Sequence, residues 1–315
     1  MTKQEKIYIA GHRGLAGSAI VRSLQKNGHT NLVTRTHAEL DLIDARAVAE
    51  FFASEKPDHV ILAAAKVGGI LANDTYPADF IHQNLAIQTN VIHQAAQSGV
   101  KRLIFLGSSC IYPRDCPQPI KEEYLLTGPL EETNKAYAIA KIAGIEMCAS
   151  YNKQYGTQFL CAMPTNLYGP GDNSDLNTSH VLPALLRKAI TAKKENQPSM
   201  IVWGTGTPRR EFLYSDDLGD ACAMLLALPW DTIVNALPKP TLPLINVGYG
   251  EDMTIRELAE AIADAVGFSG TLEWDRSKPV GTPKKLMDSS RMRALGWKPM
   301  TTLPIGLPTI AAQQS

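Results

Sequence analysis

The sequence predicts an α/β protein, built as a doubly wound parallel sheet with a smaller, interleaved C-terminal domain. Three observations support this fold class. Short apolar runs alternate with longer amphipathic segments over the first half of the chain. A glycine-rich turn follows the first apolar run, as is typical of a strand that leads into a helix. After Pro164 the alternation loosens, and loops rich in Pro, Gly, Asn and Asp appear.

The first half of the chain predicts parallel strands joined by helices. Residues 7–10 form a short apolar run, which is expected of a buried parallel strand. Residues 18–26 place apolar side chains at helical spacing, and Gly28 then ends that helix. Further strands are expected at 32–33, 59–65, 103–106 and 159–163, and further helices at 44–54, 77–98 and 133–155. This order implies right-handed crossovers and a sheet covered on both faces.

The second half is expected to build the smaller domain. Strands are predicted at 200–203 and 244–247, and helices at 181–192, 216–228 and 254–266. We therefore predict one domain from residues 1–165, which also receives about 204–235, and a second from residues 166–203 and 236–315.

Composition and charge exclude several classes of protein. The hydrophobic fraction of 44% and the charged fraction of 20% are ordinary for a globular chain. Lys and Arg total 31, as do Asp and Glu, and this balance argues against a general nucleic-acid binder. No apolar run approaches the ~20 residues of a membrane span, and residues 1–6 are polar with no apolar segment behind them. We expect no nucleic acid, no membrane and no secretion.

The cysteines predict neither disulfides nor a metal site. Their number is odd, and none lies in a Cys-x-x-Cys pair or near histidines at zinc spacing. Reduced thiols are typical of a cytoplasmic protein. The cysteines are Cys110, Cys116, Cys148, Cys161 and Cys222.

A dinucleotide-binding turn is predicted directly after the first strand. Residues 11–17 have the G-x-x-G-x-x-G spacing of a Rossmann-type domain. Glycines let the backbone approach a pyrophosphate closely, and the free N–H groups at the start of the helix favour an anion. The residues expected to hold the cofactor here are Gly11, His12, Arg13, Gly14, Leu15, Ala16 and Gly17.

Two arginines favour NADP(H) as the cofactor. An enzyme that uses NAD usually has a carboxylate at the end of the second strand. Here residues 33–37 read Val-Thr-Arg-Thr-His, and the first acid is Glu39. Arg35 lies in this stretch and Arg13 can reach it, and two guanidinium groups suit a 2′-phosphate. We include Arg35 and His37 among the cofactor contacts.

Tyr137 and Lys141 form a Y-x-x-x-K pair on a predicted helix. The i, i+4 spacing puts both side chains on one face. We expect the nearby ammonium to lower the pKa of the phenol, so that Tyr137 can exchange a proton with a carbonyl as hydride is transferred. Ser108 or Ser109, directly after the fourth strand, can hydrogen-bond the same carbonyl.

In this order, the glycine loop, the serines and the Y-x-x-x-K pair resemble the extended short-chain dehydrogenase/reductases. Longer segments resemble the GDP-L-fucose synthase family, whose members are GDP-4-keto-6-deoxy-D-mannose 3,5-epimerase-4-reductases. The most specific segments are 66–69, Lys-Val-Gly-Gly, and 109–113, Ser-Cys-Ile-Tyr-Pro. Further matches lie at 9–14, 63–70, 106–113, 137–144, 163–170, 203–206, 210–213 and 281–285.

The resemblance implies a two-stage reaction on a GDP-sugar. A 4-keto group acidifies the hydrogens at C3 and C5, so one base and one acid can invert both centres before NADPH reduces C4. The resemblance makes Cys110 the base and His180 the acid, and it gives Tyr137, Lys141 and Ser108 to the reduction. From the residues alone, Cys110 would be a buried packing residue and His180 a loop or helix-cap histidine.

The resemblance also implies binding residues and an assembly. The two long helices, 77–98 and 133–155, pair across a twofold axis in the family, which implies a homodimer. The cofactor contacts implied are Leu106, Gly107, Ser108, Ser109, Lys141, Pro164, Thr165, Asn166, Leu167 and His180, and the substrate contacts are Lys188, Trp203 and Arg210.

The sequence departs from the family at three places. Lys188 stands where an arginine is common, and Val280 replaces an aspartate that contacts substrate. Near the end, Pro304 and Pro308 lie where the family has a final helix.

Three alternatives stay open. A 4-epimerase of this fold retains NAD, a 4,6-dehydratase adds a glutamate after the serines, and a non-catalytic NADP sensor usually loses the tyrosine. Cys110, the two arginines and the intact pair of Tyr137 and Lys141 weigh against these readings.

Overall fold

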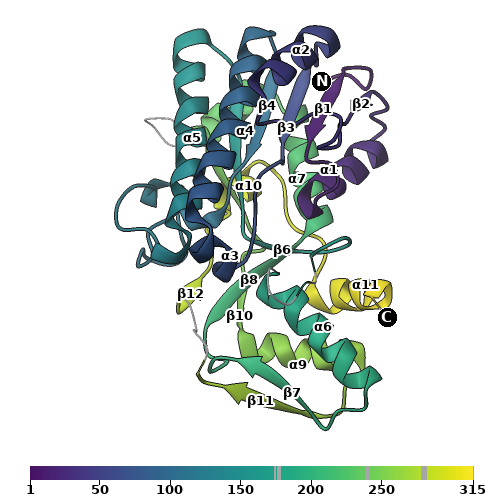
Figure 1. Cartoon of the computed structure of the whole chain (residues 1–315). Coiled ribbons are helices and arrows are strands. Elements are labelled where there is room, and N and C mark those ends of the chain that lie inside the picture. The colour runs from purple at the N-terminus through teal and green to yellow at the C-terminus, as the bar shows by residue number, and fades with distance from the viewer. Residues whose placement is uncertain (174, 176–178, 238–241, 278–281, 315) are drawn as a thin grey trace.

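A six-stranded parallel sheet forms the larger part of the molecule (Figure 1). The computed structural model describes residues 1–173, 175, 179–237, 242–277 and 282–314. All pairings in this sheet are parallel, in the order β2-β1-β3-β4-β5-β9. The strands are β1 (Ile7–Ala10), β2 (Leu32–Val33), β3 (His59–Leu62), β4 (Arg102–Leu106), β5 (Phe159–Pro164) and β9 (Leu244–Val247).

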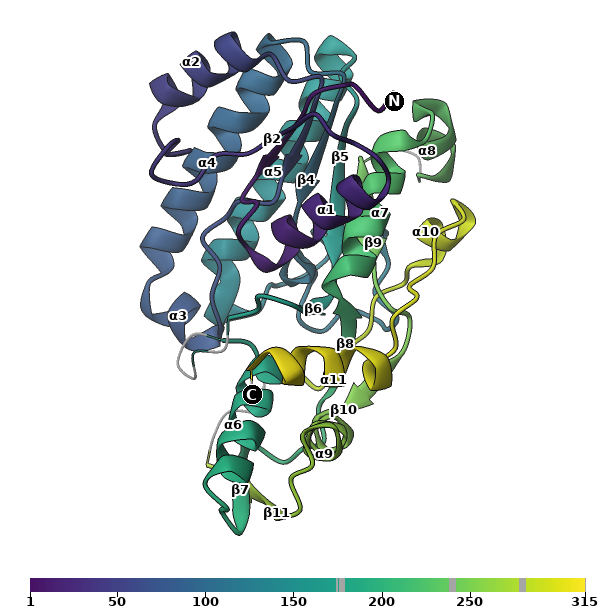
Figure 2. The same ribbon diagram turned by 90° about the vertical axis from the view of Figure 1, so that its right-hand side faces the viewer.

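Helices cover both faces because each strand sends alternate apolar side chains to opposite sides. Ile7 and Ile9 lie in one core, and their neighbours Tyr8 and Ala10 lie in another. The two helical layers stand on either side of the sheet in Figure 2. One contains α1 (Leu15–Lys26) and α7 (Ser215–Ala227), and the other contains α2 (Ala45–Glu55), α4 (Pro77–Gln97) and α5 (Lys135–Tyr155). The predicted fold class is confirmed.

The smaller unit lies beyond the carboxyl ends of the parallel strands. Its main sheet has the order β10-β8-β12, with β6 also paired to β8, and β7 pairs separately with β11. A third apolar core holds it together. Its strands are β6 (Asn166–Tyr168), β7 (Ser199–Trp203), β8 (Arg209–Tyr214), β10 (Asp252–Thr254), β11 (Thr271–Asp275) and β12 (Lys284–Lys285), and its helices are α6 (Val181–Lys194), α9 (Ile255–Val266) and α11 (Leu303–Gln314).

The chain passes repeatedly between the two units. Strand β9 completes the large sheet, although residues 236–315 were assigned to the smaller domain, and β8 lies in the smaller sheet, although it falls within 204–235. The domain division itself stays a prediction. The shorter helices are α3 (Ile70–Thr75), α8 (Trp230–Ala236) and α10 (Ser290–Ala294), and three 3-10 turns are η1 (Ser109–Ile111), η2 (Glu122–Tyr124) and η3 (Glu132–Asn134).

The prolines near the end of the chain do not abolish a final helix. Pro304 lies in the first turn of α11, where an N–H has no helical partner, and Pro308 lies inside the helix. Leu307 and Ile310 are buried against α6 and α9, and this packing holds the segment helical. Within the described ranges, no helix combines the length and apolarity that crossing a membrane requires.

Arg102 joins the large sheet to the end of α7. Its side chain is buried, and Nη1 donates to the carbonyls of Leu225 and Leu226 at 3.0 Å each. Nη2 donates to Gln158 Oε1 at 2.8 Å, and the guanidinium lies over the Trp230 ring at 5.5 Å. The arginine therefore satisfies backbone carbonyls that the helix leaves without partners.

Replacing Arg102 by Met should lower the free energy of unfolding by about 3 kcal/mol, because the buried carbonyls lose a charged donor. Urea unfolding followed by circular dichroism measures this loss. The free energy of unfolding of Arg102→Lys should lie between those of Arg102→Met and the wild type, since one ammonium cannot reach both Leu225 and Gln158. Equal stability of Arg102→Met and the wild type would contradict the prediction.

Candidate active site

The glycine loop between β1 and α1 is shaped for a ligand with a bulky anionic group. Gly11 has φ +85°, and a Cβ there would lie 2.6 Å from the Ala64 nitrogen. A Cβ at Gly17 would lie 2.1 Å from the Gly11 oxygen. Gly14 starts α1 with no side-chain cap, so the first N–H groups of the helix stay available. His12 Nδ1 is buried and has no hydrogen-bond partner among the residues that the structure describes. These features fit the pyrophosphate of a dinucleotide.

The two predicted arginines lie near one another beside this loop. Glu39 shows this, because its pKa is lowered first by hydrogen bonds from Thr36 and then by the charges of Arg35 and Arg13. Arg35 is engaged with Glu55 and lies 5.4 Å over the Phe51 ring, whereas the Arg13 side chain is exposed. Arg13 is therefore the more readily available guanidinium for a 2′-phosphate.

The predicted contact His37 is exposed. Its Nδ1 lies 3.7 Å from Asp41 Oδ1. The side chain is therefore open to a ligand that lies along this edge of the molecule.

The remaining predicted cofactor contacts lie at the carboxyl ends of neighbouring strands. This edge is where doubly wound sheets bind their ligands. A Cβ at Gly107 would lie 2.0 Å from Met163 Cε, so a side chain there would displace the end of Met163. Asn166 Nδ2 donates to the Glu211 carbonyl at 2.9 Å, and the Thr165 N–H donates to the Val247 carbonyl at 3.1 Å. The members of this group are Leu106, Gly107, Ser108 and Ser109, which begin with the last residue of β4, and Pro164, Thr165, Asn166 and Leu167, which begin with the last residue of β5.

Lys141 and Tyr137 lie on one face of α5, as predicted. Lys141 is buried, its Nζ donates to the Leu106 carbonyl at 2.9 Å, and it lies 5.7 Å from the Tyr137 ring centroid. Burial lowers the pKa of Lys141 to about 8. Burial also raises the pKa of Tyr137, and the nearby Cys110 adds to this rise. The expectation that the ammonium lowers the pKa of the phenol is therefore wrong for this structure, because burial disfavours the phenolate.

Cys110 lies in the η1 turn directly after the serines. Its N–H donates to Ser108 Oγ at 3.5 Å, and its side chain is buried. Burial raises the pKa of the thiol, whereas Lys285, Ser108 and Lys141 oppose that rise. The structure thus brings Cys110, Ser108, Tyr137 and Lys141 together.

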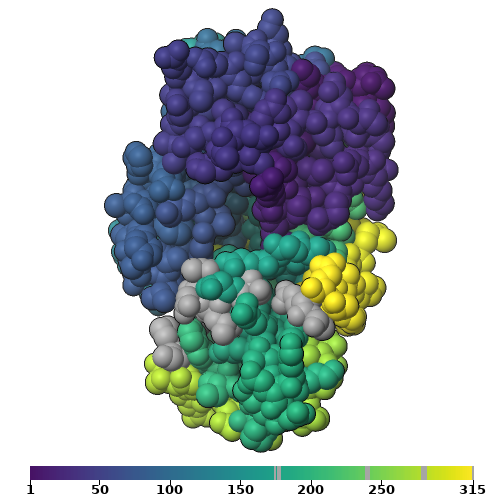
Figure 3. All heavy atoms as spheres, turned by 45° about the vertical axis from the view of Figure 1, so that its right-hand side comes forward, coloured from purple at the N-terminus to yellow at the C-terminus, as the bar shows by residue number. Residues whose placement is uncertain are grey.

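His180 begins α6 on the other side of the same region. Its pKa is lowered by burial and then by the charge of Lys285. The side chain contacts solvent at the same time, which is consistent with a residue that lines a deep cleft. Figure 3 shows a hollow between the purple N-terminal residues and the teal segment of the smaller unit.

Lys285 is the residue that the sequence analysis did not assign. It lies on β12, opposite Arg210 of β8 in the parallel register. The preceding pair, Lys284 and Arg209, shares one carboxylate, Asp252, at 3.2 and 2.7 Å. Because side chains alternate along a strand, Lys285 and Arg210 face away from this carboxylate. Neither forms an ion pair with any residue that the structure describes.

The charge of Lys285 acts on both Cys110 and His180. It affects the pKa of each group, and Arg210 lowers the pKa of Lys285 after burial has done so. The sequence offered one signal, the similarity of residues 281–285 to a known family, but a two-residue strand carries no periodicity of its own.

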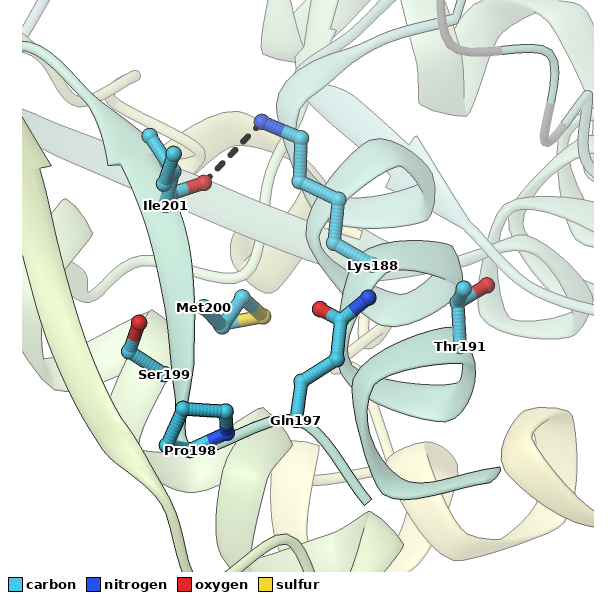
Figure 4. Close-up of a pocket in the computed structure, with 7 residues that line it drawn as sticks. All are labelled: Lys188, Thr191, Gln197, Pro198, Ser199, Met200 and Ile201. Carbon is cyan, nitrogen blue, oxygen red and sulfur yellow. Dashed lines mark hydrogen bonds between the residues drawn. The ribbon is translucent and has the colours of Figure 1, made fainter. Parts of the chain in front are cut away.

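Lys188 and Trp203 lie together in the smaller unit. Lys188 Nζ donates to the Ile201 carbonyl at 3.0 Å and lies 4.9 Å from the Trp203 ring centroid. The Trp203 ring is half exposed. A cavity of about 400 Å³ opens beside them between α6 and β7 (Figure 4). It is lined by Lys188, Thr191, Gln197, Pro198, Ser199, Met200 and Ile201.

Some sequence-based assignments cannot be placed. Val280 and Gly281 lie outside the described residues, as do Asn177 and Thr178 before His180. Among the residues that the structure does describe, no three His, Cys, Asp or Glu side chains are grouped as a metal ion would need.

The fold, the glycine loop after β1 and the Tyr-Lys pair on α5 define a dinucleotide-dependent enzyme. The chain belongs to the NAD dependent epimerase/dehydratase family, whose model matches residues 7–235. The resemblance drawn from the sequence motifs is thereby confirmed.

Within this family, the chain is similar to enzymes that are named for their action on GDP-sugars. GDP-L-fucose synthase of Escherichia coli (strain K12) is 55% identical over 307 residues, which are 98% of this chain and 95% of the relative. GDP-L-fucose synthase 1 of Arabidopsis thaliana is 58% identical over 305 residues, covering 97% and 91%. A solved structure, a GDP-mannoheptose C4 reductase from Campylobacter jejuni with NADP bound, is 41% identical with a TM-score of 0.89, and covers 100% of this chain and 99% of that one.

Replacing Arg13 by Ala should weaken binding of NADPH by about ten- to a hundredfold, because a charge-assisted pair with the 2′-phosphate is lost. Binding of NADH should change little. Titration of each cofactor by fluorescence measures the difference. If binding of NADPH and of NADH is weakened equally, Arg13 does not contact the 2′-phosphate.

Proposed function

We infer that this chain is an NADPH-dependent enzyme that converts GDP-4-keto-6-deoxy-D-mannose to GDP-L-fucose. It does so by epimerisation at C3 and C5, followed by reduction of the C4 ketone. The observation that carries this function is that two reactive sets, Tyr137 with Lys141 and Cys110 with His180, lie close together: Cys110 acts on Tyr137 and Lys141, and Lys285 acts on both Cys110 and His180. Similarity to GDP-L-fucose synthases along almost the whole chain supports it.

For the reduction, NADPH supplies the hydride when it is bound. Tyr137 donates the proton to the ketone oxygen, and its raised pKa keeps the phenol protonated at neutral pH. Ser108 offers a hydroxyl to the same oxygen, which stabilises the developing charge. Lys141 supplies a buried positive charge beside Tyr137, which favours transfer of the phenolic proton.

For the epimerisations, Cys110 removes the proton next to the ketone and His180 returns one to the opposite face. A thiol whose pKa is raised by burial is a stronger base once it is deprotonated, and the charge of Lys285 helps it to reach that state. An imidazolium whose pKa is lowered is a stronger acid. The ketone must therefore still be present while these proton transfers occur, which places reduction last.

The diphosphate and the guanosine of the substrate would lie along the cations of the smaller unit that form no ion pair with the described residues. Arg210 suits the diphosphate, because a guanidinium matches phosphate oxygens in geometry. Trp203 offers a ring face, and the cavity beside Lys188 has the size of a purine base with room to spare. We assign that cavity to the guanine end of the substrate.

We also propose that the enzyme is a cytoplasmic homodimer. Helices α4 and α5 lie side by side along one flank of the molecule (Figure 1), where a second copy can pair with them across a twofold axis. The five free cysteines support a reducing compartment. Light scattering at micromolar concentration should give the mass of a dimer, and a monomer mass would contradict this assembly.

The direct test is oxidation of NADPH in the presence of GDP-4-keto-6-deoxy-D-mannose, with the product identified by NMR. The expected product is GDP-L-fucose. A product that keeps the manno configuration at C3 and C5 would identify a simple ketosugar reductase instead.

Replacing Tyr137 by Phe should abolish NADPH oxidation while deuterium from heavy water still enters the sugar at C3 and C5. Cys110→Ala should suppress that exchange, because the base is removed, yet permit reduction of the unepimerised ketone. NMR of the sugar after incubation in heavy water, with and without NADPH, separates the two stages.

His180→Asn is the matched variant for the acid. It should leave some exchange but slow inversion, because a proton removed from one face lacks its donor on the other. Exchange at the wild-type rate in Cys110→Ala would overturn the epimerase assignment.

A further inference from the structure

Asn246 of β9 holds together two segments that carry reactive groups. It is fully buried, and its Oδ1 accepts a hydrogen bond from the Tyr112 hydroxyl at 2.5 Å. Its Nδ2 donates to the carbonyls of Ile120 at 3.0 Å and Asp288 at 3.2 Å. All its polar side-chain atoms are therefore used, and each partner comes from a different part of the chain.

The first of these segments carries Cys110. Tyr112 follows Cys110 by two residues and is buried, so its hydroxyl fixes the end of the η1 turn. Ser108 Oγ holds the start of the same turn through the Cys110 N–H. The thiol is thus placed by one hydrogen bond on each side of it.

The second segment carries Lys285. Directly after it, the Leu286 carbonyl accepts from the Ile120 N–H at 2.7 Å, and the Asp288 N–H donates back to the Ile120 carbonyl at 2.8 Å. Ser289 Oγ then accepts from the Gly248 N–H at 2.8 Å, and Gly248 lies two residues after Asn246, just past the end of β9. The ammonium therefore lies at the end of a segment that β9 and residue 120 hold in place.

The distance between the Cys110 thiol and the Lys285 ammonium matters because several charged groups surround the thiol. Lys285 is the first charge to act on Cys110, Lys141 acts more weakly, and Tyr137 lies close enough for the thiolate to affect it. Beyond Asn246, Glu122 Oε1 accepts from the Asn246 N–H at 3.0 Å, and Arg291 pairs with the same carboxyl group at 2.9 Å. Burial raises the pKa of Glu122 to about 7, so this carboxyl group also titrates near neutral pH, and its charge acts on Tyr112.

We propose that Tyr112 is a positioning residue, which through Asn246 ties the turn of Cys110 to the segment of Lys285 and so sets how closely the ammonium approaches the thiol. The proposal rests on the proposed role of Cys110 as the base. Without the Tyr112 hydroxyl, the turn loses its connection to Asn246 while both chemical groups remain. The thiol should then reach its thiolate form only at higher pH.

The test is the rate of Cys110 alkylation by iodoacetamide as a function of pH, read by mass spectrometry of the Cys110 peptide. It is done in a Cys116→Ser background, because Cys116 is the partly exposed competitor. Cys110 is itself buried but keeps 7% of its surface exposed, whereas Cys148, Cys161 and Cys222 have none exposed. Tyr112→Phe should raise the midpoint by about one pH unit, which corresponds to moving a charge from about 4 to 6 Å at an effective dielectric constant of about 20. Tyr168 is also buried, and its hydroxyl has no hydrogen-bond partner within the described part of the chain, so Tyr168→Phe should leave the midpoint unchanged.

A double-mutant cycle separates positioning from general loosening. In a Lys285→Met background, Tyr112→Phe should no longer shift the midpoint, because the ammonium through which it acts is gone. Ser289→Ala, which loosens the Lys285 segment from Gly248 without touching Tyr112, should raise the midpoint as well. This second variant also carries the test if Tyr112→Phe does not fold.

The same variants report on turnover. Deuterium exchange into the ketosugar at pH 7 should slow roughly tenfold in Tyr112→Phe, in line with the smaller thiolate fraction, while reduction is affected less. A wild-type alkylation midpoint in both Tyr112→Phe and Ser289→Ala would overturn the proposal, as would an equal shift with and without Lys285. Alkylation needs no substrate, so these outcomes stand even if the assay for GDP-L-fucose fails.

Discussion

The hydrogen bond from Lys141 Nζ to the Leu106 carbonyl joins the two halves of the reactive region. Leu106 is the last residue of β4, and the chain then runs directly into Ser108 and Cys110. Lys141 lies one helical turn after Tyr137 on α5. One buried contact between a helix and the end of a strand therefore fixes the proposed proton donor for reduction relative to the proposed base for epimerisation.

Burial sets the chemistry of these groups more than their neighbours do. The pKa of Tyr137 and of Cys110 rises, and the pKa of Lys141, His180 and Lys285 falls. Each shift favours the uncharged form, as removal from water requires. A substrate that brings a diphosphate would add negative charge beside Lys285 and Arg210, and would thereby favour the charged form of Lys285 and oppose the effect of burial on its pKa.

The larger sheet and the proton-transfer pair of α5 were predictable because both rest on local patterns. Apolar runs at 7–10 and 103–106 and the four-residue spacing of Tyr137 and Lys141 need no knowledge of distant contacts. The place of Lys285 does require knowledge of distant contacts, since it depends on the pairing of β12 with β8, which lies more than seventy residues away. The direction of the Tyr137 pKa was also beyond the sequence, because spacing shows which charge is near and not how much water is excluded.

The position of β9 bears on how the molecule is made. It is the outermost strand beside β5 and comes late in the chain, after β6, α6, β7 and β8 of the smaller unit. During synthesis, the edge of β5 stays uncovered until residues 244–247 leave the ribosome. An open, apolar strand edge is a template for pairing with other chains, so the growing polypeptide passes through a long interval in which it is prone to aggregate. Chains that stop short of β9 would carry that edge permanently and become targets for chaperones and proteases.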